Sequence, residues 1–225
     1  MGAQFAHVGG TFVHAPEVLA ERLRQISAIV LDWDGVFNRG EKAQGASSGF
    51  TEADSMGINM LRYALWRRDG RLPAVAIITG EHNASAEQLA RREHFDSIYL
   101  GVKDKGEAMA HWRRRHTRPP HEIASVFDDI NDLAMATDCG IRVLVRRGAS
   151  VLLRSHVVAR RLCDYVTASE SGNHAVRETA ELLLGLMGSF EEVVESRCAQ
   201  DEAYRAYFDA RQCVELDVVD GAKLR

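Results

Sequence analysis

The chain has 225 residues, of which 46% are hydrophobic and 27% charged, a composition typical of one folded globular domain. Its formal net charge of -4 argues against a surface for nucleic acid. No stretch approaches the roughly eighteen uninterrupted apolar residues of a membrane span, and the first residues lack the pattern of a signal peptide. Four widely spaced cysteines favour reduced thiols. We therefore expect a cytoplasmic protein that binds neither nucleic acid nor a membrane.

Apolar runs of strand length alternate along the chain with segments of helical periodicity. The apolar runs predict strands, at residues 28–31, 74–78, 98–100, 123–127 and 141–145, and the first of them is uninterrupted, as expected of a strand buried on both faces of a sheet. A first-turn proline or a helical spacing of apolar residues predicts helices, at residues 16–24, 58–65, 84–93, 105–114 and 176–187. This alternation predicts an α/β fold, in which helices cover both faces of a parallel central sheet.

Three segments depart from the alternation. Residues 1–15 precede the first predicted helix, and we expect them to form a flexible N-terminal segment. Residues 37–53 carry three glycines and no helical period, which predicts a β-hairpin flap after the first strand. Residues 189–225 are charged and carry a group of aromatic residues, which predicts a helical extension, either on its own domain or as an arm onto a neighbour. The compact domain is then expected to span residues 16–188.

Polar residues follow the first two predicted strands, at the edge of a parallel sheet where ligands bind. Asp32 and Asp34 come directly after the first strand, in the run DWDGVF. Carboxylates beside a buried strand are costly unless they bind a cation or accept strong hydrogen bonds. A turn capped by Gly35 is the alternative interpretation of DWDG taken alone. The second strand ends in Thr79 and Gly80, a hydroxyl followed by a residue that leaves backbone N–H groups accessible.

A lysine and an acidic cluster follow the next two strands. Lys105 stands at the start of a predicted helix, where a cation opposes the helix dipole and is not explained by stability alone. After the fourth strand come more acidic residues than a helix cap requires, namely Asp128, Asp129 and Asp132. Each feature has a structural explanation when taken singly. Their joint occurrence at one edge of a sheet favours a shared site.

Together these residues supply the groups that phosphoryl transfer needs. A carboxylate nucleophile approaches a phosphate dianion only when a divalent cation screens the repulsion, and hard oxygen ligands suit Mg²⁺. A second carboxylate can protonate the leaving alkoxide and later deprotonate water. A hydroxyl, a backbone N–H and an ammonium can stabilise the phosphoryl oxygens. The pattern predicts a magnesium-dependent phosphatase for a small phosphorylated metabolite.

The order of these motifs resembles that of the haloacid dehalogenase superfamily, which is DxDG, a Thr or Ser, a Lys and an acidic cluster. From about Ile29 to Leu184 the chain resembles the capless branch typified by the 3-deoxy-D-manno-octulosonate 8-phosphate phosphatases. The segments that carry the resemblance are DWDGVF, FTEADSMGI, AIITG, LGVKDK, FDDINDL and DYVTASESGNHAVRE. The resemblance implies a Rossmann-like three-layer α/β/α sandwich without a large cap domain. It also implies a homo-tetramer in which flaps and neighbouring subunits shape the pocket.

The resemblance also implies a role for each site residue. Asp32 would be the phosphorylated nucleophile and Asp34 the general acid and base. Magnesium would be held by the Asp32 carboxylate, the Asp34 backbone carbonyl and Asp128. The phosphoryl group would be bound by residues that follow the second and third strands, namely Thr79, Gly80 and Lys105. Support for the metal ligands would come from the rest of the acidic cluster, namely Asp129 or Asp132.

Four positions depart from this branch, whose sugar-acid phosphatases carry arginines near the pocket. The residues at these positions are Ala53, Asn59, Glu81 and Asn173. A guanidinium is the natural bidentate partner of a carboxylate, so these replacements weaken the case for the best-known substrate of the branch. The catalytic set supports hydrolysis of a sugar or sugar-acid phosphate and leaves the particular substrate open. The alternative function is a catalytically weak binding or scaffold subunit that uses its C-terminal extension.

Overall fold

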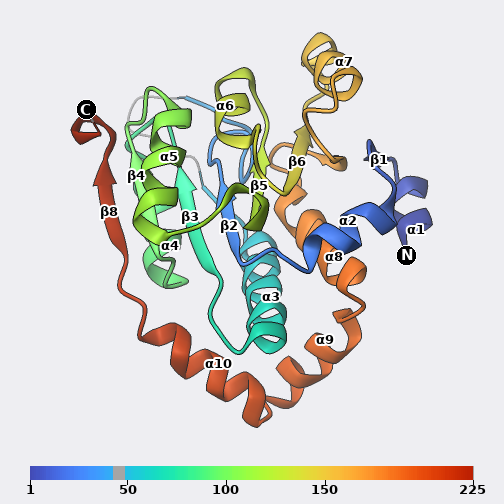
Figure 1. The fold of residues 1–225 in the computed structure, drawn as a ribbon, viewed down its shortest axis with the longest axis vertical. Helices are drawn as coiled ribbons and strands as arrows, with labels where there is room; N and C mark the ends of the chain where they lie inside the picture. The colour runs from blue at the N-terminus through green and yellow to red at the C-terminus, as the bar shows by residue number, and fades with distance from the viewer. Residues whose placement is uncertain (43–48, 225) are drawn as a thin grey trace.

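The computed structural model describes residues 1–42 and 49–224, and its centre is one sheet (Figure 1). The strands are β1 (Thr11–Phe12), β2 (Ala28–Leu31), β3 (Ala74–Ile78), β4 (Ser97–Leu100), β5 (Ile123–Phe127), β6 (Ile141–Arg146), β7 (Tyr165–Glu170) and β8 (Asp217–Asp220). Their order across the sheet is β1-β7-β6-β5-β2-β3-β4-β8. Neighbouring strands are parallel except β1 and β7, which are antiparallel.

Helices connect these strands and extend both ends of the chain. They are α1 (Gly2–His7), α2 (Pro16–Leu23), α3 (Glu52–Asp69), α4 (Ala84–Arg92), α5 (Lys105–His116), α6 (Leu133–Ala136), α7 (Val151–Ala159), α8 (Ala175–Met187), α9 (Phe190–Ala199) and α10 (Glu202–Gln212). No helix in the described part of the chain is both long and apolar enough to cross a membrane.

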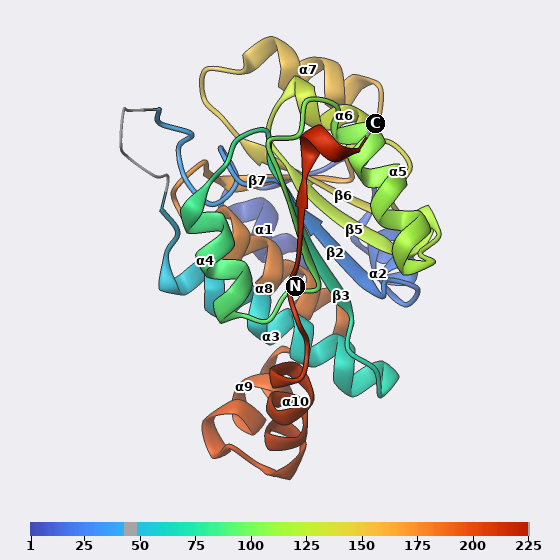
Figure 2. The same cartoon turned by 90° about the vertical axis from the view of Figure 1, so that its left-hand side faces the viewer.

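The sheet separates two hydrophobic clusters, because successive side chains of a strand point to opposite faces. On β2, Ile29 and Leu31 join the cluster formed with α3, α4 and α8, whereas Ala28 and Val30 join the cluster formed with α5 and α6. Figure 2 shows these helices on the two sides of the sheet. The predicted three-layer α/β/α sandwich with a parallel central sheet is therefore confirmed. The described residues contain no large cap domain.

The boundaries predicted for the central strands agree closely with the structure, and the largest difference lies around the predicted flap. Residues 43–48 of that flap are outside the described residues. Its described flanks contain an isolated bridge between Asp34 and Asn38 and the first turn of α3. Helix α3 begins at Glu52, earlier than predicted, because the Thr51 hydroxyl accepts a hydrogen bond from the Asp54 N–H (3.2 Å) and caps the helix.

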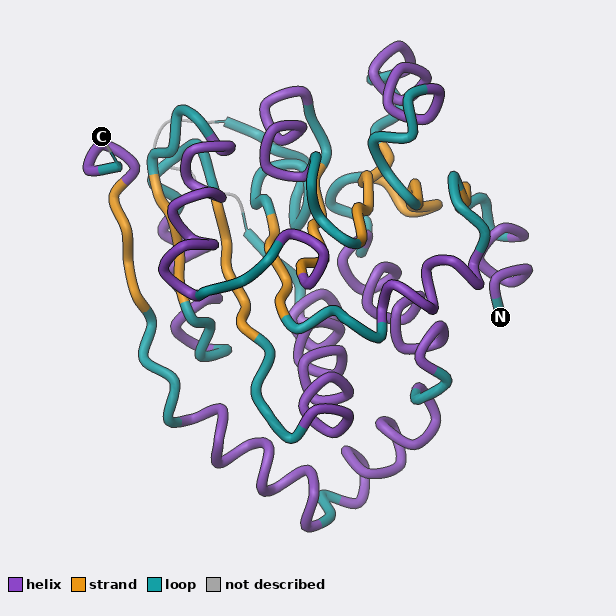
Figure 3. Tube along the Cα trace, viewed as in Figure 1, coloured by secondary structure: helices purple, strands orange, loops and turns teal. Residues whose placement is uncertain are grey.

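Both ends of the chain differ from the expectation. Residues 1–15, expected to be flexible, include α1 and the edge strand β1, where Phe12 packs against Tyr165 with ring centroids 4.9 Å apart. The extension at residues 189–225 is helical only in part. After α9 and α10 it returns to the opposite edge of the sheet, where β8 pairs with β4 (Figure 3).

The aromatic residues of the extension pack on the chain's own α3. The Tyr63 ring lies 5.1 Å from the Tyr207 ring and 5.3 Å from the Tyr204 ring, measured between centroids. All three side chains are buried. Of the two placements left open by the sequence, packing on its own domain is the one observed.

Candidate active site

The predicted catalytic residues meet where three parallel strands end. Asp32 follows β2, Thr79 follows β3 and Asp128 follows β5, and all three side chains are buried. Leu31, the last residue of β2, is in register with Ile77 and Val126 on the two neighbouring strands. This register aligns the strand ends and brings the residues that follow them to one place.

Three buried carboxylates form the centre of the site, which we call the carboxylate cluster: Asp32, Asp128 and Asp132. One oxygen of each lies within 4.8 Å of one oxygen of the others. Burial raises the pKa of Asp32 well above its ordinary value, and the charge of Asp132 raises it further. Burial raises the pKa of Asp128 to about 6, although the guanidinium of Arg147 opposes the rise. The cluster therefore concentrates negative charge that a cation would stabilise.

Lys105 lies within the carboxylate cluster. Its ammonium donates hydrogen bonds to Asp32 Oδ1 and to Asp132 Oδ1, the latter at 2.5 Å. Although burial opposes it, the charges of Asp32 and Asp132 raise the pKa of Lys105. The lysine is therefore a fixed positive charge beside the predicted nucleophile.

The oxygens of Asp128 suit a divalent cation. Oδ1 is buried and accepts no hydrogen bond from the described residues, while Oδ2 accepts one from Arg147. Gly35 has a φ of +92°, and a Cβ there would lie 2.0 Å from Asp128 Oδ2. The backbone can pass this close to the carboxylate only because Gly35 has no side chain. Hard oxygens with an unused acceptor fit Mg²⁺.

Asp34 lies outside the carboxylate cluster, and its side chain is 17% exposed. Its Oδ2 accepts hydrogen bonds from Lys42 Nζ (2.5 Å) and from Asn83 Nδ2 (3.1 Å). Asn83 Nδ2 also donates to Thr79 Oγ1 (3.0 Å). The same amide thus links two predicted catalytic residues, and Gly80, which directly follows Thr79, is exposed.

The two remaining acidic residues have different environments. Asp129 is exposed and caps the short 3-10 helix η2 (Ile130–Asp132), accepting a hydrogen bond from the Ile130 N–H (2.7 Å). Asp132 is buried and accepts from the N–H groups of Asp128 (3.3 Å) and Asp129 (3.1 Å) as well as from Lys105. Of the two residues, Asp132 is therefore the one that contacts other site residues, namely Lys105 and Asp128.

Two residues of the site, Asn83 and Arg147, were not predicted from the sequence. Asn83 stands at the N-cap of α4, a position that by itself accounts for an asparagine. Arg147 follows β6, and its neighbour in sequence is also an arginine. The only available signal was their position after strands of the predicted sheet, which does not distinguish a site residue from a loop residue.

Asn59, one of the residues that stand where the branch has arginines, is bound to other parts of the chain. Its Nδ2 donates to Glu93 Oε2 (2.8 Å), and its backbone carbonyl accepts from the Tyr207 hydroxyl (3.2 Å). Glu93 is also paired with Arg211 of the extension. In this chain, position 59 therefore helps to attach α10.

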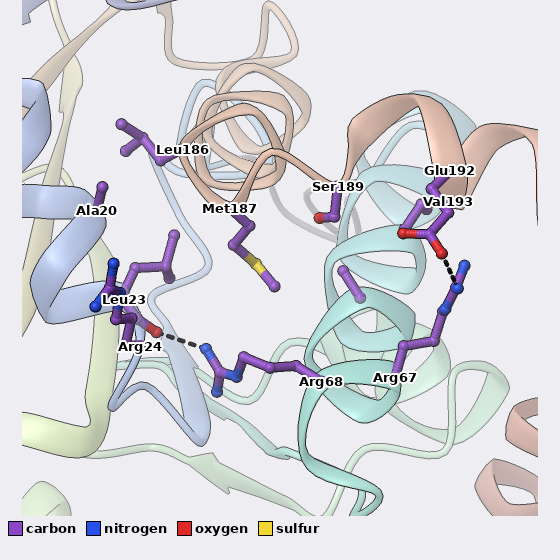
Figure 4. A pocket seen from close by; sticks show the side chains of 11 residues that line it. Ala20, Leu23, Arg24, Arg67, Arg68, Leu186, Met187, Ser189, Glu192 and Val193 are labelled. Atoms are coloured by element: carbon purple, nitrogen blue, oxygen red, sulfur yellow. Dashed lines mark hydrogen bonds and ion pairs between the residues drawn. The ribbon is translucent and has the colours of Figure 1, made fainter.

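A groove of about 460 Å³ lies near the end of α3 that is remote from Glu52 (Figure 4). Two of its arginines are bonded within the chain, since Arg67 pairs with Glu192 and Arg68 donates to the Leu23 carbonyl oxygen (2.6 Å). None of the predicted site residues lines the groove. The predicted chemistry belongs to the carboxylate cluster at the other end of the sheet.

Comparison with known proteins shows clear similarity over most of the chain. No family model matches it. The 3-deoxy-D-manno-octulosonate 8-phosphate phosphatase of Salmonella typhimurium is 29% identical over 182 residues, 79% of this chain and 89% of that protein. A solved structure of a putative phosphatase of this name from Vibrio cholerae is 28% identical, with a TM-score of 0.63 over 76% of this chain and 89% of its own.

A further solved structure has the same fold with bound ligands. The 3-deoxy-D-manno-octulosonate 8-phosphate phosphatase of Moraxella catarrhalis, in complex with magnesium, phosphate and the sugar acid KDO, has a TM-score of 0.67 at 24% identity. The comparison covers 81% of this chain and 99% of that one.

The fold, the motif set and the relatives together show a chain similar to phosphatases, a class of hydrolases, of the haloacid dehalogenase superfamily. Within that superfamily it resembles the 3-deoxy-D-manno-octulosonate 8-phosphate phosphatases. The resemblance and the enzyme class predicted from the sequence are therefore confirmed.

Proposed function

We propose that the chain is a magnesium-dependent phosphomonoesterase that forms an aspartyl phosphate on Asp32. The observation that carries this proposal is the carboxylate cluster, in which Asp32 is paired with Lys105 while Asp128 Oδ1 has no partner among the described residues. A purely structural cluster of buried acids would be expected to have its acceptors satisfied.

In the first half-reaction a carboxylate oxygen of Asp32 attacks phosphorus, and the bond from phosphorus to the ester oxygen breaks. Asp34 donates a proton to that leaving oxygen. In the second half-reaction Asp34 takes a proton from water, the water oxygen attacks phosphorus, and the Asp32 carboxylate is released with inorganic phosphate. The location of Asp34 outside the cluster supports this role, because the group must reach both the leaving alcohol and water.

Magnesium would be held by the Asp32 carboxylate, the Asp34 backbone carbonyl and Asp128, and when bound it screens the repulsion between nucleophile and phosphate. Lys105, Thr79 and the backbone of Gly80 would stabilise the phosphoryl oxygens. Asn83 supports Thr79 through its hydrogen bond. Asp132 would fix the ammonium of Lys105 through the hydrogen bond it accepts, whereas Asp129 acts as a helix cap.

The substrate we propose is a small sugar or sugar-acid phosphate. The support is the name shared by the relatives and the KDO molecule bound in the Moraxella catarrhalis enzyme. With this function we propose residues 16–188 as the catalytic domain, residues 189–225 as its extension, a homo-tetrameric assembly and a cytoplasmic location. The tetramer follows from the resemblance to the branch, whereas the domain bounds and the location follow from the pattern and composition of the sequence.

Phosphate release from a panel of sugar and sugar-acid phosphates tests the proposal. We expect release with Mg²⁺ from at least one ester, its loss with EDTA, and its loss in Asp32→Asn. Asp138→Asn makes the same chemical change at an exposed position before β6 and should retain activity. Full activity of Asp32→Asn, or release that is insensitive to EDTA, would contradict the proposal.

A further inference from the structure

Asn83 occupies a helix N-cap without capping the helix. It is the N-cap residue of α4, yet its side chain makes no hydrogen bond to the first turn. At other N-caps of the chain the side chain does accept from a backbone N–H, as Asp104 and Asp201 do. The Asn83 side chain is buried and contacts the site instead, so helix capping does not explain it.

Both hydrogens of the Asn83 amide are directed at predicted catalytic residues. Its Nδ2 donates to Asp34 Oδ2 (3.1 Å) and to Thr79 Oγ1 (3.0 Å). An amide nitrogen of this kind carries two hydrogens, so these two bonds use its full donor capacity. The reversed amide would bring its oxygen against a carboxylate oxygen, and the two would repel each other. The orientation of the amide therefore follows from the chemistry of its partners.

The bonds that Thr79 accepts determine how its hydroxyl can act. Its Oγ1 accepts from Asn83 Nδ2 and from the backbone N–H of Glu81 (3.4 Å). A hydroxyl has two acceptor lone pairs and one hydrogen, so an oxygen that accepts two bonds can offer only its hydrogen to a further group. Phosphoryl oxygens are acceptors. The Thr79 hydroxyl is thus prepared to donate to them.

The same amide restrains Asp34. Its Oδ2 accepts from Asn83 and from Lys42 Nζ (2.5 Å). The Lys42 side chain is 56% exposed and flexible, so the buried amide is the firmer of the two restraints. Two donors on one oxygen restrict the rotation of the carboxylate and so fix its direction. Proton transfer to a leaving oxygen depends on such alignment.

We propose that Asn83 is a positioning residue that aligns Asp34 for proton transfer and sets the Thr79 hydroxyl to donate to the phosphoryl group. The inference rests on the proposed function and adds to it a residue outside the motifs DxDG, Thr, Lys and acidic cluster. One buried amide then links the protonation of the leaving oxygen to the binding of the phosphoryl group.

The first half of the test measures binding of inorganic phosphate by isothermal titration calorimetry at saturating Mg²⁺. Asn83→Ala should weaken binding about tenfold, as for the loss of one hydrogen bond that orients a donor to an anion. In a Thr79→Val background, which lacks the hydroxyl, the same substitution should have little further effect. An equal loss in both backgrounds, unchanged affinity in Asn83→Ala, or no binding by the wild type would overturn the inference.

Two further variants separate positioning from helix capping and from a general loss of stability. Asn83→Ser keeps a residue that favours N-caps, but its single hydrogen cannot serve both Asp34 and Thr79, so it should behave as Asn83→Ala does. Asn59→Ala removes an amide that contacts Glu93 at the opposite end of α4, and it should bind phosphate as the wild type does. Full affinity in Asn83→Ser, or an equal loss in Asn59→Ala, would overturn the inference.

The second half compares kcat/KM for two aryl esters, p-nitrophenyl phosphate and phenyl phosphate. Phenolate is the more basic leaving group, so its departure depends more on the proton from Asp34. Asn83→Ala should lower kcat/KM about fivefold more for phenyl phosphate, because misalignment removes part of a contribution of about 10²–10⁴. A structural defect would lower both values by the same factor, and that result would overturn the role at Asp34.

The two halves separate this inference from the proposed function, because phosphate binding requires no turnover. If the wild type hydrolyses no ester while Asn83→Ala weakens phosphate binding only where the Thr79 hydroxyl is present, the proposed function fails and the positioning of Thr79 stands. If phosphate release occurs but Asn83→Ala changes neither the phosphate affinity nor the ratio between the two esters, the proposed function stands and the inference is wrong.

Discussion

Arg211 Nη1 donates a 2.6 Å hydrogen bond to Glu93 Oε2, and each side chain is less than one-tenth exposed. The pair joins α10 of the C-terminal extension to the residue that ends α4. Glu93 also accepts hydrogen bonds from Ser55 (2.9 Å) and Asn59 (2.8 Å) on α3. The extension is thus attached to α3 and to the end of α4 through a buried charge.

Arg211→Met should lower the free energy of unfolding by about 3 kcal/mol, the lower end for a broken buried pair, because Glu93 loses its buried cation and keeps only the more exposed Arg92, whose Nε lies 3.2 Å from Glu93 Oε1. Denaturant unfolding of the whole chain measures this loss. Arg205→Met, an exposed position on the same helix, is the matched control and should change little. Adding Glu93→Gln to Arg211→Met should recover part of the stability. A double variant as unstable as the sum of the two single losses would contradict the account.

Asp32→Asn should stabilise the metal-free protein while abolishing phosphate release. Burial and the charge of Asp132 raise the pKa of Asp32, so its ionised form is costly in the folded state. A neutral amide removes that cost, and we expect a higher free energy of unfolding in EDTA than for the wild type. Added Mg²⁺ should raise the melting temperature of the wild type more than that of the variant. A large loss of stability in metal-free Asp32→Asn would indicate a structural role instead.

The contribution of Asp128 to the free energy of unfolding of the metal-free protein should increase as the pH falls from 7 towards 5. Its pKa is about 6 in the folded chain against an ordinary 3.8, so the native state binds more protons in this range. Stability therefore falls as the pH rises through the folded pKa. The measurement is the free energy of unfolding in EDTA, compared between wild type and Asp128→Asn. A difference between them that does not vary with pH would refute this prediction.

Gly35→Ala should weaken Mg²⁺ binding specifically, in addition to a small loss in the free energy of unfolding. The added Cβ would lie 2.0 Å from Asp128 Oδ2, which forces the carboxylate to move. Gly40→Ala is the matched control, because Gly40 also has a positive φ but a Cβ there would meet its nearest atom at 3.6 Å. Each variant should lose about 1 kcal/mol from the backbone conformation. Only Gly35→Ala should weaken Mg²⁺ in calorimetry, and equal affinities in the two variants would count against the arrangement.

The sequence predicts the centre of the sheet well because β2 and β3 are continuous apolar runs and β5 is interrupted only by Ser125, and all three strands are buried on both faces. The edge strands β1 and β8 escape prediction, since Thr11–Phe12 and Asp217–Asp220 are too short or too polar to carry a strand pattern. Their pairing depends on partners distant in sequence, such as Val166 for Thr11.

The site divides in the same way. Asp32, Thr79, Lys105 and Asp128 could be predicted because each follows a recognisable strand. Arg147 could not, since its contact with Asp128 depends on how β6 lies beside β5 and on the space above Gly35. The distinction between Asp129 and Asp132 likewise depends on burial, which a run of acidic residues does not reveal.

Chemical trapping of the phosphorylated residue tests the central claim most directly. Asp34→Asn, incubated with Mg²⁺ and a hydrolysable ester found by the panel, is treated with borohydride, which reduces an aspartyl phosphate to homoserine. Mass spectrometry of the peptide that contains DWNGVF then locates the modified residue. We predict homoserine at residue 32, dependent on substrate and on Mg²⁺. Phosphate release without any modification at Asp32, or with modification at another carboxylate, would contradict the account.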